Sequence, residues 1–350
     1  MGEVISTEEL KRVIEDANKN RLKVGTREQP GRTNKTKQIQ NRDLTVISMD
    51  VAALYPSITA QMATKAVRES MKSSNLKWNN ITIKQLIRYV SVCCDRKSIE
   101  DDKLGEVIPI PKTKTTLNSL TNPSKRTREQ NGDNQFNPTL RNPTESEVKK
   151  IIGHAVSAGI NVCMTNHYYR INGEIRCQAE GGAIGSELTG EVSRNFMLNW
   201  DKKFLRKVKD LGLAIDLYAR YVDDIVTALY SINRGWCYNT KKNIMEFSKE
   251  LEASDNRDSE TRTAEVLVQI ANSINPKIQF TWDTPGKNTN RRMPVLDLAI
   301  WVKNTNGVPE IVHSFYKKKV ASKYTVLKRS ALSNKIKKST LLQEAIRRLG

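Results

Sequence analysis

The pattern of apolar and polar residues predicts a β-hairpin in the second half of the chain, with two acidic residues at its turn. Residues 213–221 (LAIDLYARY) and 225–230 (IVTALY) have the apolar and aromatic composition of strands. The tetrapeptide YVDD at 221–224 joins them, so that Asp223 and Asp224 lie at a tight junction. Aspartates are also common turn formers, and the hairpin alone is therefore weak evidence of function.

A second apolar run, far upstream, ends in another aspartate. Residues 44–49 are largely apolar on both faces, as in a central strand that is covered on both sides. Asp50 follows at the C-terminal end of this strand, and Pro56 breaks the pattern. If the strand lies beside the hairpin, Asp50 joins Asp223 and Asp224 in one cluster of carboxylates.

Apolar residues at helical spacing predict several helices. One pattern consists of Ile58, Met62 and Ala66, soon after the upstream strand. By contrast, residues 97–146 are rich in Thr, Asn, Pro and Lys and lack a periodic apolar pattern, so we expect a long surface insertion there. In chain order, helices are expected near residues 8–18, 58–71, 82–94, 145–158, 188–204, 239–252, 260–274 and 339–349.

Further strands complete the predicted fold. Residues 166–178 have the pattern of a hairpin with Asn172-Gly173 as its two-residue turn. Residues 280–302 are expected to form strand, loop and strand, and a further strand begins at Ile311. Strands and helices mix without a steady βαβ rhythm. This favours an α+β fold, in which helices pack on one face of a mainly antiparallel sheet.

The charge of the chain adds a prediction about its partners. The 350 residues include 58 Lys and Arg against 38 Asp and Glu, a formal charge of +20, which points to a polyanion such as nucleic acid. From Ile311 onward, 11 basic residues stand against one acid, Glu344. A basic surface can also be merely solvated, but this concentration of charge in one segment favours nucleic-acid binding.

Other features argue against several classes of protein. No run of 18 apolar residues predicts a membrane span, and the acidic, polar N-terminus does not resemble a secretory signal. Five cysteines without CxxC spacing argue against a disulfide framework or a zinc site. We therefore expect an intracellular protein, of the nucleus or the cytoplasm, that is not secreted and has no membrane partner. Only three histidines occur, which disfavours histidine-based catalysis.

Three carboxylates in one cluster suit phosphoryl transfer assisted by two metal ions. Such a site holds two divalent cations about 3.5–4 Å apart, and hard cations such as Mg²⁺ prefer oxygen ligands. Asp50 and Asp223 can bridge both ions if their strands lie side by side, and Asp224 would complete the cluster. Without cations, the three charges would repel one another and raise one another's pKa values.

The order of three short motifs resembles a known family. DVAALY at 50–55, GGAIGS at 181–186 and YVDD at 221–224 are similar to motifs A, B and C of a reverse transcriptase palm. The flanking stretches YYRINGEIRCQAEGG, KIQFTWD, VLDLAIWV and HSFYKKKVASKY resemble those of Penelope-like retroelements. The resemblance covers residues 44–350 without the insertion at 97–146.

The resemblance implies an RNA-directed DNA polymerase of a retroelement. Residues 44–310 would form a polymerase palm, 1–43 a basic N-terminal segment with partial fingers, and 311–350 the basic start of a thumb. It also implies two Mg²⁺ ions, which Mn²⁺ can replace, an RNA or DNA template with its primer, and deoxynucleoside triphosphates. The implied catalytic residues are Asp50, Asp223 and Asp224, and the implied metal ligands are these three and Val51.

The resemblance further assigns residues that bind nucleotide and nucleic acid. Tyr55, five residues after Asp50, is similar to the aromatic steric gate that excludes a 2′-hydroxyl. The other implied nucleotide-binding residues are Gly181, Gly182, Gly185, Ser186 and Tyr221. The implied nucleic-acid-binding residues are Gln178, Lys317, Lys318 and Lys319.

Each of these residues also has a purely structural interpretation. The glycines could form only a flexible turn, Tyr55 could be a core aromatic, and Gln178 could be an ordinary surface residue. The lysine run could simply be solvated. Asp297 in VLDL fits a buried capping or network residue better than a metal ligand.

The motifs depart from the pattern of the family in some places. Ile184 stands where a Met is expected, and Thr189-Gly190 replaces the usual Ser-Pro pair. No clear copy of the fingers motif that grips the triphosphate precedes Asp50, and no GIY-YIG endonuclease follows the thumb-like segment. These departures are expected of a fragment or of a diverged gene product.

Two other functions stay open. ALYPSI at 53–58 also resembles the first motif of family B DNA polymerases, but their Asp-Thr-Asp third motif and preceding exonuclease domain are not found. A non-catalytic, nucleic-acid-binding remnant of a retroelement would keep the fold and the charge. Primer extension on an RNA template with Mg²⁺ separates polymerase from remnant. The sequence does not indicate an oligomeric state.

Overall fold

The computed structural model describes residues 2–4, 6–24, 33–73, 145–183, 186–316 and 333–349. The chain divides into two compact units. The first comprises Met1–Leu54 and Trp200–Gly350, and the second comprises Tyr55–Asn199. Several predicted features lie outside the described residues, namely the helix near 82–94, the insertion up to residue 144, Gly185, Lys317, Lys318 and Lys319.

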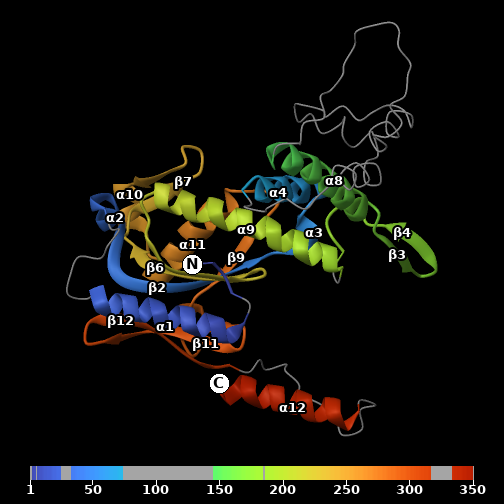
Figure 1. Ribbon diagram of the computed structural model, residues 1–350. Coiled ribbons are helices and arrows are strands. Elements are labelled where there is room, and N and C mark those ends of the chain that lie inside the picture. Colours follow the sequence, from blue (N-terminus) through green and yellow to red (C-terminus); the bar gives the residue numbers. More distant parts are fainter. Residues whose placement is uncertain are drawn as a thin grey trace, which may run out of the picture. The chain divides into compact units, whose positions relative to one another are not determined.

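A five-stranded sheet forms the centre of the first unit. Its strand order is β1-β5-β6-β2-β9, and neighbours are antiparallel except for β1 and β5, which run parallel. The predicted hairpin is confirmed as β5 and β6, and the strand that leads to Asp50 lies beside β6 (Figure 1). The strands are β1 (Gly2–Glu3), β2 (Gln40–Val51), β5 (Ile215–Tyr221), β6 (Asp224–Ile232) and β9 (Phe280–Asp283).

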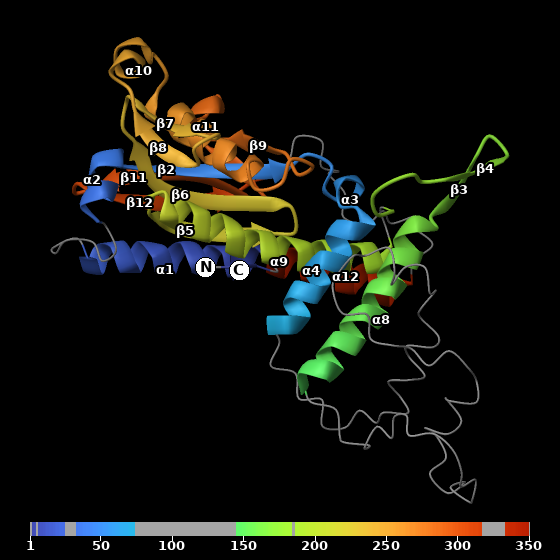
Figure 2. The same cartoon turned by 90° about the horizontal axis from the view of Figure 1, so that it is seen from above.

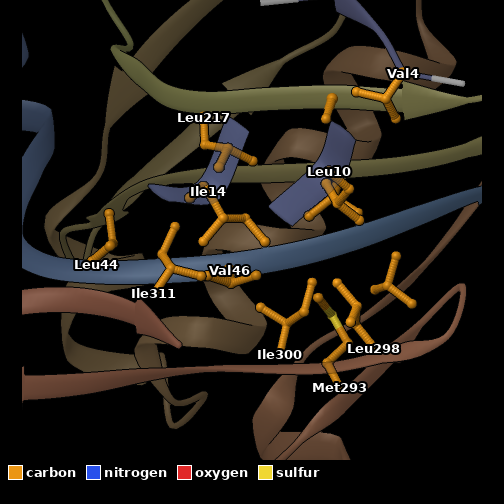
Figure 3. Packing of buried hydrophobic residues seen from close by; sticks show 14 of the residues in the cluster. Val4, Leu10, Ile14, Leu44, Val46, Leu217, Met293, Leu298, Ile300 and Ile311 are labelled. Atoms are coloured by element: carbon orange, nitrogen blue, oxygen red, sulfur yellow. The ribbon is translucent and has the colours of Figure 1, made fainter. Parts of the chain in front are cut away.

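One face of this sheet is covered by a helix and a second sheet. Leu44 and Val46 of β2 belong to the same buried cluster as Ile14 of helix α1 and Ile300 of β11 (Figure 3). Alternate residues along β2 thus point into this layer, as the strand period requires. The elements of the layer are α1 (Thr7–Val24), β10 (Met293–Val295), β11 (Leu298–Thr305) and β12 (Val308–Phe315), the last three forming an antiparallel sheet.

Helices cover the opposite face. The rings of Trp200 and Phe204 stack with centroids 4.9 Å apart, and Phe204 lies 5.9 Å from Tyr218 of β5. Helix α11 contacts β2, β6 and β9 on its own side. Figure 1 shows α1 and α11 on opposite sides of β2. Helices therefore lie on both faces rather than on one as predicted, because a strand buried on both sides needs a layer on each. These helices are α9 (Glu187–Asp210) and α11 (Ser259–Asn272).

The helix predicted near residues 239–252 is wrong. Most of this stretch belongs to a hairpin in which Tyr238 pairs with Met245, and Asn243 adopts a positive φ of 56° before the second strand. The rings of Trp236 and Phe247 contact each other across the hairpin, with centroids 5.8 Å apart, and such aromatic cross-strand pairs favour a sheet. The observed elements are β7 (Trp236–Asn239), β8 (Ile244–Phe247) and a short helix, α10 (Lys249–Ser254).

The second unit is mainly helical. Helices α4 and α8 pack side by side (Figure 2), and Nε of Arg68 donates a 2.9 Å hydrogen bond to Oγ of Ser157 between them. The predicted hairpin is confirmed, with positive φ angles of 50° at Asn172 and 87° at Gly173, as a type I′ turn requires. The elements are α4 (Ala60–Ser73), α8 (Glu145–Thr165), β3 (Tyr168–Ile171), β4 (Glu174–Cys177) and the first half of α9.

The remaining helical predictions agree with the structure. Those near 8–18, 58–71, 145–158, 188–204, 260–274 and 339–349 correspond to α1, α4, α8, α9, α11 and α12. Within the described ranges, no helix is both long and apolar enough to cross a membrane. The elements not yet given are α2 (Asn34–Ile39), α3 (Leu54–Ser57), the 3₁₀ helix η2 (Pro285–Lys287) and α12 (Asn334–Leu349).

Candidate active site

Strand pairing brings the three predicted carboxylates to one end of the central sheet. The ladder between β2 and β6 ends where Met49 pairs with Ile225. Asp50 and Asp224 are therefore the next residues on two adjacent strands, and Asp223 lies in the turn just before β6. The strands lie side by side, as the sequence hypothesis requires for a shared site.

The carboxylates of Asp50 and Asp223 interact electrostatically. Partial burial of its carboxylate raises the pKa of Asp50 above the ordinary value, and the negative charge of Asp223 raises it further. A hydrogen bond from the backbone N–H of Val51 acts in the opposite direction. Asp50 as a whole residue is nevertheless exposed, so solvent and ligands can reach it. Two carboxylates that repel each other in an accessible position would be stabilised by a cation.

The donor chemistry of this pair fits a hard divalent cation. Carboxylate oxygens are preferred ligands of Mg²⁺, and Asp224 offers a third carboxylate on the adjacent residue. Val51, the remaining predicted ligand, is buried at the end of β2 and pairs with Phe280. Across the described part of the chain, no three acidic, histidine or cysteine residues form a ready-made metal group. Within the predicted set, the carboxylates of Asp50 and Asp223 lie near enough to interact electrostatically, and their role as metal ligands stays a prediction.

The turn that holds Asp223 has an unusual backbone. Val222 adopts a positive φ of 56°, a region that β-branched residues rarely occupy. A two-residue hairpin loop with positive φ at its first position normally has glycine there. Holding a non-glycine residue in such a conformation costs about 1–3 kcal/mol. Surrounding structure must therefore keep Val222, and with it Asp223, in place.

A buried arginine that the motifs do not indicate contacts this turn. Arg220 is fully buried, and its Nη1 donates a 2.8 Å hydrogen bond to the carbonyl oxygen of Val222. Its Nε donates to both carboxylate oxygens of Asp201, at 3.1 and 2.9 Å. Two signals in the sequence could have revealed the pair. Arg220 interrupts an apolar strand, and Asp201 lies on the apolar stripe of its helix beside Trp200 and Phe204.

The predicted glycine loop is closely packed. The N–H of Gly182 donates a 2.9 Å hydrogen bond to the carbonyl oxygen of Tyr55. Gly181 has a positive φ of 80°, and a Cβ there would lie 2.2 Å from the carbonyl oxygen of Pro56. A Cβ on Gly182 would lie 2.3 Å from Cγ2 of Thr189. Glycine is therefore required at both positions for close backbone approach, and a loose turn is the wrong description of this loop.

Gln178 donates hydrogen bonds to the backbone of the same loop. Its side-chain nitrogen donates to the carbonyl oxygen of Glu180 at 2.9 Å and to that of Gly182 at 3.4 Å. Its backbone N–H donates to the carbonyl oxygen of His167 at 2.8 Å. These contacts give Gln178 a structural role in the loop, and its predicted contact with nucleic acid stays a prediction.

The other predicted residues occupy varied positions. Tyr55 is half-buried in α3, and Tyr221 is 37% exposed at the end of β5, where it pairs with Asp224. Ser186 precedes α9, and its carbonyl oxygen accepts a 3.2 Å hydrogen bond from the N–H of Gly190. These positions leave the predicted nucleotide contacts of Tyr55, Tyr221 and Ser186 untested.

Asp297 has structural contacts in the first unit. Its carboxylate accepts a 3.4 Å hydrogen bond from the hydroxyl of Thr7, and its carbonyl oxygen accepts a 2.7 Å bond from the N–H of Tyr316. It lies in the turn between β10 and β11, where Leu296 has a positive φ of 51°. These contacts agree with the network role favoured from the sequence.

Comparisons with known proteins give a coarse structural likeness. No protein-family model matches the chain, and no curated protein matches it. Among solved structures, the chain is similar to apo telomerase from Candida tropicalis, truncated from its C-terminal domain, with 10% identity and a TM-score of 0.40 over 89% of this chain. It is also similar to telomerase from Candida albicans in complex with a fragment of telomeric RNA, with 9% identity and a TM-score of 0.37 over 93% of this chain. The chain spans 41% and 38% of the lengths of those two proteins, and the function proposed below rests on the residues of the site itself.

Proposed function

We propose that this protein is an RNA-directed DNA polymerase of the reverse transcriptase type, derived from a Penelope-like retroelement. The observation that carries the proposal is the interacting pair of Asp50 and Asp223 at the ends of adjacent antiparallel strands. The motifs around this pair follow the order of a reverse transcriptase palm. The reaction would be transfer of a deoxynucleotide onto the 3′-hydroxyl of a primer paired with an RNA or DNA template.

Asp50 and Asp223 would hold the Mg²⁺ ions, with Asp224 as the third carboxylate. When bound, the ions would lower the pKa of the attacking hydroxyl and neutralise charge on the phosphates. The chain contributes the placement of the oxygen donors, which β2 and the β5–β6 turn hold near each other before any ion arrives. Val51 would add a backbone contact from the end of β2.

The residues that the motif resemblance assigns to nucleotide binding would contact the incoming nucleotide. Gly181 and Gly182 allow the loop to pack closely against Pro56 and Thr189, and the nucleotide would contact this loop. Tyr55 would act as the gate against a 2′-hydroxyl, and Ser186 and Tyr221 would contact the nucleotide. The excess of basic residues, including Lys317, Lys318 and Lys319, would bind the phosphates of template and primer.

Primer extension on an RNA template tests the proposal. Wild-type protein should extend the primer with Mg²⁺ and deoxynucleotides, and Asp223→Asn should lose about a thousandfold or more in rate, because a metal ligand is lost. Asp297→Asn is the matched control, since Asp297 contacts Thr7 instead of the site, and it should retain activity. Binding of the primer–template should be nearly unchanged in both variants.

Two outcomes would contradict the proposal. An Asp223→Asn protein that extends primers at the wild-type rate would show that the site lies elsewhere. A wild-type protein that binds primer–template tightly but adds no nucleotide would instead favour the second function open from the sequence, a nucleic-acid-binding remnant without catalysis.

A further inference from the structure

We propose that Arg220 and Asp201 form a positioning pair that fixes the strained turn beneath Asp223 and so sets the spacing of the metal-binding carboxylates. The geometry of the pair comes from contacts among described residues of the first unit. Its consequence for catalysis rests on the proposed function.

The guanidinium of Arg220 connects the turn to helix α9. One nitrogen, Nη1, donates 2.8 Å to the carbonyl oxygen of Val222, the residue with the unfavourable positive φ. The carbonyl of Val222 belongs to the peptide group that carries the N–H of Asp223, so this bond fixes the orientation of that peptide. Another nitrogen, Nε, donates to both carboxylate oxygens of Asp201 on α9.

The pair is held rigidly by its surroundings. The hydroxyl of Tyr218 donates a 2.6 Å hydrogen bond to Oδ1 of Asp201. Arg220 and Tyr218 are fully buried, and Asp201 is 6% exposed. Charge-assisted hydrogen bonds are strong in such a poorly solvated environment, and the planar guanidinium fork has little freedom to adjust. The hydrogen bond from Arg220 therefore keeps the turn at Val222 in a fixed position.

The N-terminal strand β1 pairs with the edge of β5 that does not face β6, and so holds the backbone of Arg220. Glu3 of β1 pairs with Arg220 of β5, and the N–H of Val4 donates 2.8 Å to the carbonyl oxygen of Arg220. The carboxylate of Glu3 also lies 3.7 Å from Nη1. Arg220 is thus constrained through its main chain and its side chain at once.

A second buried arginine in the same unit provides a matched control. Nη1 of Arg262 lies 3.2 Å from the carboxylate of Asp255, and Nε donates 2.9 Å to the carbonyl oxygen of Ile232. The chemistry is that of Arg220, a buried arginine joining an aspartate to a backbone carbonyl. Ile232, however, lies at the end of β6 opposite to Asp224. If Arg220 has only a structural role, its substitution should have the same effects as the substitution of Arg262.

The test compares Arg220→Lys with Arg262→Lys in the full chain. Three quantities are measured: thermal unfolding, the Kd for Mn²⁺ by electron paramagnetic resonance without substrate, and kcat and KM for the nucleotide in primer extension. Both variants should lose stability, because the single ammonium group of lysine cannot replace two guanidinium nitrogens that bind an aspartate and a backbone carbonyl at once. Only Arg220→Lys should raise the Kd for Mn²⁺, by about 10–100-fold, as expected when a group that orients a metal ligand is changed. Its kcat should fall by a similar factor, with a smaller change in KM.

The proposal is overturned if Arg220→Lys unfolds like Arg262→Lys but keeps the wild-type Kd for Mn²⁺ and the wild-type kcat. If Arg220→Lys does not fold, Tyr218→Phe repeats the comparison while retaining both charges. Removing this one hydrogen bond should weaken Mn²⁺ binding by about twofold to tenfold, and unchanged binding would contradict the proposal. A wild-type protein that binds Mn²⁺ but extends no primer contradicts the proposed polymerase function alone, whereas one that binds no Mn²⁺ contradicts both.

Discussion

Partial burial of its carboxylate raises the pKa of Asp50 at the end of β2, and the negative charge of Asp223, in the turn between β5 and β6, raises that pKa further. The fold therefore keeps two negatively charged carboxylates near each other, although their repulsion lowers its stability. Arrangements that destabilise the fold locally are typical of functional sites. Because the same repulsion would favour cation binding, the relationship connects the stability of the protein directly to its proposed activity.

The first prediction is that Asp50→Asn stabilises the metal-free protein at pH 7. The raised pKa means that the folded protein holds the proton of Asp50 more tightly than the unfolded protein does. The wild type therefore loses stability as the pH rises from the ordinary, unfolded pKa of about 3.9 to the raised, folded pKa. The stability gained by Asp50→Asn should be complete above the raised, folded pKa and absent below the unfolded pKa. Chemical denaturation at pH 7 and at a pH below the unfolded pKa measures the difference.

The exposed Asp16 on α1 supplies the control for this prediction. Its side chain is 74% exposed and makes one long ion pair with Lys19, so Asp16→Asn should change the free energy of unfolding very little. Added Mg²⁺ should stabilise the wild type more than Asp50→Asn, because the proposed function makes Asp50 a metal ligand. Equal stability of wild type and Asp50→Asn at pH 7 would remove the evidence for a strained carboxylate pair.

The second prediction concerns the packing of the glycine loop. Gly181→Ala should destabilise the protein by about 2 kcal/mol or more, because the new Cβ meets the backbone of Pro56 and φ is positive. Gly190→Ala, in α9 with open space around it, should instead stabilise by about 0.5–1 kcal/mol. Denaturant unfolding of the two variants measures both signs. A Gly181→Ala protein as stable as the wild type would show that the loop can move away from Pro56.

The third prediction concerns the basic C-terminal segment. If about five phosphates are neutralised, the logarithm of the affinity for single-stranded or hybrid nucleic acid should fall with the logarithm of salt concentration at a slope of roughly −3.5 to −4.5. A protein shortened to end at Tyr316 should bind more weakly and with a shallower slope. The cut belongs there because β12 pairs with β11 and Ile311 is buried, so a cut near Glu310 would damage the fold. Unchanged affinity after the cut would place the binding surface elsewhere.

The fourth prediction concerns sugar selection by Tyr55. Tyr55→Val should raise ribonucleotide incorporation by about two or more orders of magnitude, equivalent to roughly 3 kcal/mol, because the ring no longer blocks a 2′-hydroxyl. Its backbone bond to Gly182 does not involve the ring, so the loop should persist. If Tyr55 is only a core aromatic, the change costs about 3 kcal/mol of stability and leaves selectivity unchanged. Incorporation ratios and thermal stability measured on one variant, with the exposed Tyr169→Val as control, decide between these roles.

Local patterns in the sequence predicted those elements whose signals are themselves local. The turn at Asn172-Gly173 follows from two residues that tolerate positive φ, and the β5–β6 hairpin follows from two apolar runs around the aspartates. Residues 239–252 were misassigned because the aromatic contact between Trp236 and Phe247 has no signature in helical periodicity.

Long-range partnerships explain the rest of what the sequence did not reveal. Arg220 looks like an isolated charge in an apolar strand, and Asp201 stands next to Lys202 in the sequence. Only the packing of α9 on β5 shows that Asp201 and Arg220 pair. Likewise, nothing near Glu3 indicates that it will lie beside Arg220. The three carboxylates could be predicted because a family resemblance supplied the long-range relationship that composition and periodicity do not contain.

The first unit is built from two separate stretches of the chain, and this affects folding during synthesis. Met49 pairs with Ile225, and the entire second unit is synthesised between them. Until β6 leaves the ribosome, the twelve residues of β2 have no neighbouring strand on either edge in the finished order. A long strand with unpaired edges and an apolar segment, here residues 44–49, is a template for aggregation. Pairings between distant segments also form slowly. Production of this protein should therefore improve when chaperones that shield nascent chains are abundant.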